Sequence, residues 1–257
     1  MTGMNSFRSN WMEMFPPERR PLLMAHRGNR VRFPENTMAA FRQAVSDGAD
    51  ILETDLHLSS DDEFVCIHDA AVDRTLNGSG DVKDKTLKEL KVLRAFGNDS
   101  SLTDESIPTL VELAEFLPQD MALALELKTD RFLEREVCLR LRDLLAKHDV
   151  KDRTIVLSFS LERLKTVQLT VPELPVGWIS MTRVIPNLPV DLIGSFWPVF
   201  FINPFYVKMA HKHGLLTCPL DPTPDARLPY YLQLGVDAVL TDDPGKTRKE
   251  INRLLKR

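Results

Sequence analysis

Short apolar runs alternate with longer segments of helical periodicity along most of this 257-residue chain. Runs of about four to eight apolar residues predict buried strands, whereas apolar residues spaced three and four apart predict amphipathic helices. Because a strand, helix, strand order joins parallel strands through crossovers, we expect a parallel sheet covered by helices. The length and the number of segments favour closure into a TIM (β/α)₈ barrel, which is the predicted fold class.

Nine segments have strand patterns, one more than a TIM barrel uses. We expect the extra strand to lie outside the barrel wall, or two strands to pair before the barrel continues. The predicted strands are 22–25, 51–56, 64–67, 122–127, 154–158, 176–179, 200–202, 215–218 and 238–240. The predicted helices are 37–47, 132–147, 161–169, 204–213, 228–234 and 246–255.

One region, at about 70–118, interrupts this alternation after the third strand. It contains the turn signal NGSG at 77–80 and a short helical pattern at 86–93. We expect a small insertion into one connection, and such insertions in barrel enzymes lie over the catalytic face. The chain is therefore divided into an N-terminal tail at 1–21 and one barrel domain at 22–257.

Composition and charge exclude several classes of protein. A content of 43% hydrophobic and 27% charged residues is typical of a soluble globular chain, and a net charge of −4 argues against nucleic acid as a partner. No run of 18 apolar residues could span a membrane, and the first 20 residues lack the apolar core of a signal peptide. Three widely spaced cysteines suggest free thiols, so we predict a cytoplasmic protein. The sequence does not predict its oligomeric state.

The tail contains Trp11, Met12, Met14 and Phe15 among polar residues. We expect these side chains to pack on their own domain, and contact with a membrane surface or a partner is the alternative.

Two carboxylates, Glu53 and Asp55, interrupt an apolar run that otherwise predicts a buried strand. Residues two apart in a strand point to the same face, so both carboxylates project together. Without partners they would repel each other and lose hydration, at a cost on the order of several kcal/mol. A hard divalent cation removes that cost, and pairing with Arg or Lys is the alternative.

Polar residues end three other predicted strands. The motif HRG at 26–28 follows the first strand, His68-Asp69 follows the third, and Glu126-x-Lys128 closes the fourth. Carboxyl ends of barrel strands share one rim, so all these groups are expected to converge there. A lone buried histidine is more often structural, yet four polar strand ends together favour a catalytic site.

In these motifs the chain resembles the glycerophosphodiester phosphodiesterase family. The segment AHRGNRVRFPENTMAAFRQAVSDGAD is similar to the family's HRG…PENT segment and first helix. ILETDLHLSSDDEFVCIHDAAVDRTLNGSG resembles its Glu-x-Asp strand, its His-Asp pair and the turn that follows. Further counterparts occur in the family's order, from about residue 22 to the C-terminus: DKTLKELKVL, IPTLVELAEFLP, LALELK, VLSFS and GVDAVLTDDP.

The resemblance implies a TIM barrel that hydrolyses a glycerophosphodiester to an alcohol and glycerol 3-phosphate. Carried over residue by residue, it implies a divalent-metal site, an acid/base pair of histidines and a set of substrate contacts. The implied metal ligands are Glu53, Asp55 and Glu126, the acid and base are His26 and His68, and the substrate-binding residues are Arg27, Lys128, Glu35 and Asn36. Ligation by oxygen alone favours Mg²⁺ or Ca²⁺. Which histidine is the acid stays open.

The chemistry of a phosphodiester agrees with this set. Attack on phosphorus adds charge to the non-bridging oxygens, which a cation, Arg27 and Lys128 would offset. Two histidines near neutral pH can give a proton to the leaving group and take one from the nucleophile. The nucleophile is water or a hydroxyl of the substrate, which would form a cyclic phosphate.

The sequence departs from the family on a late strand, where members usually carry Trp-Thr-Val-Asn and this chain has CPLD at 218–221. We expect a wider pocket at Cys218, unless Trp178, Phe159 or Phe205 fills it, although a core position is the more frequent role of such residues. A wider pocket makes a lysophospholipase D-type activity the nearest alternative. A catalytically silent barrel that binds a phosphorylated ligand is the other.

Overall fold

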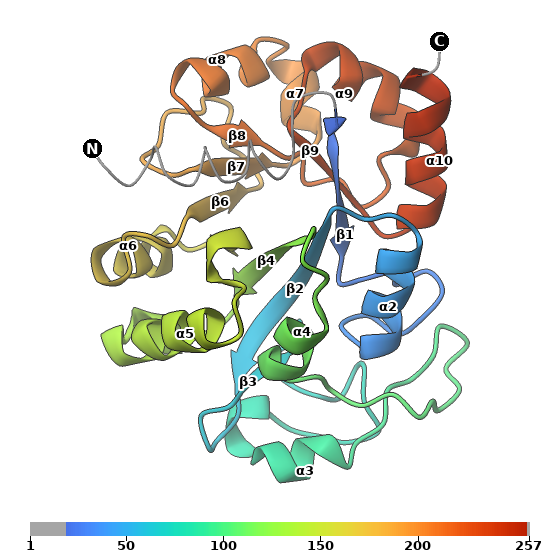
Figure 1. Ribbon diagram of the computed structural model, residues 1–257, viewed down its shortest axis with the longest axis vertical. Coiled ribbons are helices and arrows are strands. Elements are labelled where there is room, and N and C mark those ends of the chain that lie inside the picture. The colour runs from blue at the N-terminus through green and yellow to red at the C-terminus, as the bar shows by residue number, and fades with distance from the viewer. Residues whose placement is uncertain (1–18, 256–257) are drawn as a thin grey trace.

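Eight parallel strands form a nearly closed barrel with helices on its outer surface (Figure 1). This computed structural model describes residues 19–255, so the contacts predicted for the tail at 1–18 lie outside the described residues. In barrel order the wall strands are β8 (Leu216–Thr217), β7 (Leu192–Ser195), β6 (Val176–Ser180), β5 (Thr154–Ser158), β4 (Ala122–Leu127), β2 (Ile51–Leu58), β1 (Leu22–His26) and β9 (Ala238–Thr241). The amide of Asp237 donates to Thr217 O at 3.1 Å and links the two ends of the sheet.

The helices follow the strands in the order that the sequence predicts for a TIM barrel, which confirms the fold class. Threonines begin several of them: Thr37 caps α2, and Thr86 and Thr109 form capping boxes at α3 and α4. The α-helices of the described residues are α2 (Met38–Ser46), α3 (Leu87–Lys91), α4 (Leu110–Phe116), α5 (Arg135–Lys147), α6 (Leu161–Thr170), α7 (Pro198–Ile202), α8 (Tyr206–Lys212), α9 (Leu228–Leu234) and α10 (Pro244–Leu255).

The ninth strand lies outside the wall, as one of the two expectations stated. It is β3 (Phe64–Cys66), which pairs antiparallel with the far end of the long strand β2. The segment that follows folds over its own small core and carries α3, at the bottom of Figure 1. The domain boundaries at 1–21 and 22–257 stay a prediction.

One predicted strand is wrong. Residues 200–202 end the helix α7, and the sixth wall strand along the chain is β7, Leu192–Ser195. Pro198 stands in the first turn of α7, where its fixed φ and missing N–H suit a helix start. The buried ring of Phe200 packs on Tyr206 and Tyr231 behind the wall. A short apolar run does not by itself distinguish a strand from a buried helical turn.

The barrel interior changes from apolar to polar toward the carboxyl ends of three neighbouring strands. Alternate residues of each strand face the interior, and the last of them are ionisable. These positions are Leu22, Met24 and His26 on β1, Ile51, Glu53 and Asp55 on β2, and Ala122, Ala124 and Glu126 on β4. The apolar residues fill the barrel from below, so the ionisable groups gather at one rim.

Gly28 sets how closely helix α2 approaches this rim. Its φ is +80°, and a Cβ built there would lie 2.6 Å from the carbonyl carbon of Ala40. Ala40 O accepts from the amide of Asn29 at 2.9 Å, which fixes the segment that carries His26 and Arg27. Only glycine combines this backbone conformation with such a close contact.

We expect Gly28→Ala to destabilise the fold more than Gly235→Ala does. Gly235 has a φ of +73° and no heavy atom within 4 Å of the position that a Cβ would take, so its substitution costs only the backbone strain, about 1–2 kcal/mol. Gly28→Ala adds a steric clash with the backbone of Ala40, which lowers the free energy of unfolding by a further ~1–3 kcal/mol. Urea unfolding of both variants measures this difference, and equal losses would contradict the close packing of α2.

Candidate active site

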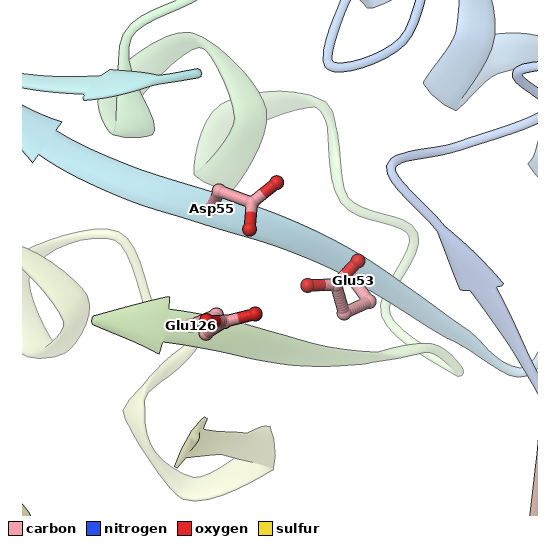
Figure 2. A group of neighbouring side chains, drawn as sticks. All are labelled: Glu53, Asp55 and Glu126. Atoms are coloured by element: carbon pink, nitrogen blue, oxygen red, sulfur yellow. The ribbon is translucent and has the colours of Figure 1, made fainter. Parts of the chain in front are cut away.

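Three buried carboxylates meet at the carboxyl end of β2 and β4. Figure 2 shows Glu53, Asp55 and Glu126 projecting from these neighbouring strands into a common space. One oxygen of each lies within 4.8 Å of the others. Asp55 is paired with Glu126 across the two parallel strands, and Glu53 precedes Asp55 by two residues on the same face. The sequence therefore predicted correctly that these three residues lie together.

Two basic side chains flank the carboxylates. The backbone amide of Arg27 donates to Glu53 Oε2 at 3.0 Å, and the side-chain Nε of Arg27 lies 2.9 Å from Asp55 Oδ2. Lys128 Nζ donates to Glu126 Oε1 at 2.7 Å and lies 3.3 Å from Asp55 Oδ1. Arg27 has a φ of 57°, a left-handed conformation that costs a non-glycine residue energy and is frequent at functional sites. Both residues predicted to contact phosphate thus lie beside the acidic cluster.

Asn36 supports Asp55 from the loop before α2. Its Nδ2 donates to Asp55 Oδ2 at 2.9 Å, and its Oδ1 accepts from Thr54 Oγ1 at 2.7 Å. Asn36 also has a positive φ, of 54°. In this structure the side chain contacts a carboxylate of the cluster, and its interpretation as a substrate-binding residue stays a prediction.

Each of the two histidines pairs with an aspartate through Nδ1. His26 Nδ1 lies 2.7 Å from Asp242 Oδ1, which comes from the loop after β9. His68 Nδ1 lies 2.6 Å from Asp69 Oδ1. Because a carboxylate accepts hydrogen bonds only, each pair favours a proton on Nδ1 and leaves Nε2 as the other ring nitrogen. His57 fixes the second pair, since its Nε2 lies 3.2 Å from the backbone oxygen of His68.

One buried carboxylate, Glu35, connects the two pairs. It lies within 3.0 Å of Arg27, 2.9 Å of Arg30 and 2.7 Å of Arg74. Arg74 donates to Asp69 at 2.5 Å, and Arg30 Nε lies 3.9 Å from Asp242. The charges therefore alternate from one histidine to the other through Glu35. The predicted substrate-binding role of Glu35 stays a prediction, and its contacts are with basic residues of the rim.

Burial and neighbouring charges shift the pKa values of the carboxylates in opposite directions. Burial, together with the charge of Asp55, raises the pKa of Glu53 well above its ordinary value. Burial also raises the pKa of Glu126, although Lys128 opposes this. For Asp55 burial is outweighed by Arg27 and Lys128, and its pKa is lowered. The negative charge of the three carboxylates, when all are ionised, therefore exceeds the positive charge of Arg27 and Lys128.

The histidine paired with Asp242 is also affected by burial, which lowers the pKa of His26 despite that hydrogen bond. In the other pair, the hydrogen bonds from Arg74 and His68 outweigh burial and lower the pKa of Asp69 to about 2.

The other half of the pocket is apolar. Beside His26, Glu53 and Glu126, the lining residues come from β1, β5, β6, β7 and β9 and from the loop after β8: Met24, Leu157, Ile179, Leu192, Gly194, Cys218, Pro219, Leu220 and Leu240. Cys218 thus lines the pocket where the family's tryptophan is expected. Trp178, Phe159 and Phe205 are not among the lining residues, and the last two are 45% and 66% exposed. The pocket wall is built from aliphatic side chains instead.

Asp221, at the family's asparagine position, is a structural residue here. It is buried and accepts from Arg227 Nη2 at 2.7 Å and from Tyr231 Oη at 2.7 Å. The guanidinium of Arg227 lies 4.4 Å from the ring centre of Trp197, so a cation–π contact also stabilises the positive charge of Arg227. The aspartate at this position therefore stabilises the rim through its contacts with Arg227 and Tyr231.

Sequence reasoning missed three residues that hold the histidines and Glu35 in place: Asp242, Arg30 and Arg74. Asp242 lies in GVDAVLTDDP and Arg74 in the Asp-Arg-Thr motif. Because both motifs resemble the family's, their polar residues were candidates for the site. No local pattern singles out Arg30.

A TIM barrel with carboxylates, imidazoles and basic side chains at the carboxyl ends of its strands defines an enzyme for an anionic substrate. Comparison with known proteins identifies the group. A sequence model described as the glycerophosphoryl diester phosphodiesterase family matches residues 26–246. A glycerophosphodiester phosphodiesterase of Caldanaerobacter subterraneus subsp. tengcongensis is 35% identical over 231 residues, 87% of this chain and 94% of its own length. One of Bacillus subtilis is 30% identical over 247 residues, 88% and 84% of the two chains.

Two solved structures have the same fold and are also similar in sequence. An Oleispira antarctica phosphodiesterase in complex with the product sn-glycerol-3-phosphate has a TM-score of 0.79 and 28% identity, over 90% of this chain and 97% of its own. A glycerophosphodiester phosphodiesterase from Agrobacterium tumefaciens has a TM-score of 0.77 and 26% identity, over 88% and 98% of the chains. This chain belongs to the glycerophosphodiester phosphodiesterase family and is a phosphoric diester hydrolase.

Among residues 19–255, no helix has the length and apolar character needed to cross a membrane.

The raised pKa of Glu53 predicts that stability falls as pH rises when divalent cations are chelated. Below the ordinary value of 4.5 the carboxyl is protonated in both states, and its stabilising effect is fully present. As pH rises toward the higher folded-state pKa, the unfolded chain loses the proton first and that stability is lost. Urea unfolding in EDTA across this range should show a flatter pH dependence for Glu53→Gln than for the wild type.

The exposed Glu162 supplies a matched control for this measurement. Glu162→Gln should keep the wild-type pH dependence, because its side chain lies at the surface in the first turn of α6. If Glu53→Gln and Glu162→Gln behaved alike, the effect would not come from the buried cluster.

Proposed function

We propose that this protein hydrolyses a glycerophosphodiester to an alcohol and glycerol 3-phosphate with a divalent cation held by Glu53, Asp55 and Glu126. His26 and His68 exchange the protons of the reaction. The observation that carries the proposal is the meeting of three buried carboxylates within 4.8 Å at the catalytic end of the barrel. The product complex of the Oleispira antarctica relative supports the same chemistry here.

The carboxylate cluster suits a hard divalent cation. Its donors are all oxygens, which Mg²⁺ and Ca²⁺ prefer. Asp55 Oδ1 is buried and lacks a hydrogen-bond partner, so it has a lone pair free for a ligand bond. Glu53, Asp55 and Glu126 carry three negative charges when ionised, against two positive charges on Arg27 and Lys128. A cation bound there would supply Lewis-acid stabilisation of the charge that develops on the phosphoryl oxygens.

Arg27 and Lys128 attract and orient the phosphate. Both have charged groups close to Asp55, Arg27 at 2.9 Å and Lys128 at 3.3 Å, so they border the space where the phosphoryl group must lie. An arginine fork suits two phosphoryl oxygens, whereas lysine acts as a point charge. The contacts with Asp55 and Glu35 hold the guanidinium of Arg27 in place before substrate arrives.

His26 and His68 are arranged for proton transfer through Nε2. Asp242 and Asp69 hold the Nδ1 atoms, which orients each ring and fixes its tautomer. His26 also lines the pocket beside Glu53 and Glu126. One histidine gives its proton to the leaving alkoxide and the other takes one from the nucleophile.

A lysophospholipid is the second candidate substrate. The specific observation in its favour is the aliphatic wall of the pocket, in which Cys218 stands where the family usually has tryptophan. The alcohol side of the substrate therefore meets apolar side chains. Because the chain is a phosphoric diester hydrolase by family, the silent binding barrel has no support beyond the general possibility of phosphate binding.

We expect His26→Ala to lower kcat for glycerophosphocholine about 10²–10⁴-fold while the apparent affinity for glycerol 3-phosphate changes little. The rate of glycerol 3-phosphate formation with Mg²⁺, Ca²⁺ or Mn²⁺ measures turnover, and EDTA should abolish it in the wild type. His213→Ala is the matched control, because His213 ends α8 away from the pocket. Full turnover by His26→Ala, or by the wild type in EDTA, would contradict the proposal.

We expect Asp242→Asn to lower kcat about 10²-fold with little change in KM, because an amide can donate to Nδ1 and favour the other tautomer of His26. The ¹⁵N chemical shifts of the His26 ring report that tautomer directly. Asp243→Asn is the control, since Asp243 caps α10 through the amide of Lys246 and does not contact His26. A fall in kcat without a change of tautomer would mean that Asp242 acts only through the fold.

A further inference from the structure

The rim of the barrel exposes large apolar side chains on one side of the pocket. They come from the loops that follow β5 and β6 and from the connection between α7 and α8. This apolar rim comprises Phe159, Met181, Val184, Ile185, Ile202 and Phe205, which are 40–72% exposed. Side chains of this size on one edge of a water-soluble domain mark an interaction surface.

The apolar rim is one continuous feature of the barrel's carboxyl end. The strands β5, β6 and β7 are neighbours in the sheet, so the loops after them share an edge. Asn203 Nδ2 donates to Val184 O at 2.9 Å and ties the connection between α7 and α8 to the loop after β6. The ring of Phe201 stacks on Tyr230 at 4.5 Å between ring centres, which holds the end of α7 in place.

The apolar rim continues the wall of the active-site pocket. Leu157 and Ile179 line the pocket near the ends of β5 and β6, and Phe159 and Met181 follow them two residues later at the surface. The apolar rim therefore begins two residues beyond the pocket wall on both strands.

The segment that carries most of the apolar rim differs in charge from the whole chain. The protein has 37 acidic residues and a net charge of −4. The segment 174–220, which supplies five of the six rim residues, contains Asp191 as its sole acidic residue, together with Arg183, Lys208 and Lys212. Asp191 precedes β7 at the opposite end of the barrel, where its carboxylate accepts from the amide of Val176. Lys208 is exposed in the first turn of α8, three residues after Phe205, whereas Lys212 ends α8 near the opposite end of the barrel.

We propose that the apolar rim docks the enzyme on an anionic phospholipid bilayer, with its apolar side chains in the headgroup region and Lys208 and Arg183 beside acidic headgroups. Apolar area and attraction between basic side chains and anionic lipids add together in such binding. A second copy of this chain is a poorer partner. A two-fold symmetric contact would place the same positive segment against itself.

Sedimentation of the full-length protein with vesicles tests the proposal. The vesicles are phosphatidylcholine alone or with an equal amount of phosphatidylglycerol. We expect the wild type to bind the mixed vesicles and to dissociate as salt is added, because the contacts of Lys208 and Arg183 with headgroups are screened. Ile202→Glu with Phe205→Glu should weaken binding at least about tenfold, since it removes two exposed apolar groups and adds negative charge.

Leu169 provides a matched control, because it is 73% exposed against 72% for Ile202 but lies at the end of α6 distant from the rim. Leu169→Glu should bind vesicles like the wild type. All variants should turn over soluble glycerophosphocholine like the wild type, since none of these residues lines the pocket. If the wild type lacked turnover, the proposed function would fail while sedimentation would still decide the docking.

Four results would overturn the proposal. The wild type could fail to sediment with the mixed vesicles, or Leu169→Glu could lose binding as fully as the rim variant. Sedimentation velocity without lipid could reveal a dimer that the rim variant abolishes, which would make the rim a contact between copies of this chain. Finally, Trp11→Glu with Phe15→Glu could abolish vesicle binding while the rim variant keeps it, which would assign binding to the tail.

Discussion

The repulsion among Glu53, Asp55 and Glu126 is the constraint on which the rest of the rim depends. Three carboxylates in a buried space are costly unless positive charge and hydrogen bonds surround them. Arg27, Lys128 and Asn36 supply part of that compensation, and Arg27 and Asn36 adopt left-handed backbone conformations while they do so. The proposed cation site rests on the remaining imbalance, which lowers the stability of the free protein.

A second level of organisation holds the histidines. Each ring is fixed by its own aspartate, and the two aspartates reach Glu35 through arginines on opposite sides. Since Glu35 also contacts Arg27, the residues that would handle protons and the residue that would hold phosphate share one carboxylate. Removing any one of these charges is therefore expected to alter the electrostatic environment of the others. The free-energy changes of paired substitutions within this network should not be additive.

Local patterns predicted much of this arrangement, and the reasons for their failures are physical. Glu53 and Asp55 were found because a two-residue period places side chains on one face, and Glu126 because it ends a buried run. The strand predicted at 200–202 is wrong because three apolar residues cannot reveal that Pro198 starts a helix just before them. Asp242 was missed because its partner His26 is 216 residues away, and only closure of the barrel brings the two together.

That closure has a consequence for synthesis on the ribosome. Strand β1 lies between β2 and β9, so one of its edges has no partner until the last part of the barrel has been made. During that interval the growing polypeptide presents an unpaired strand edge, the kind of surface through which nascent chains aggregate. His26 is thus paired with an aspartate that is translated 216 residues later, so a growing chain that lacks Asp242 leaves Nδ1 of this histidine without its partner.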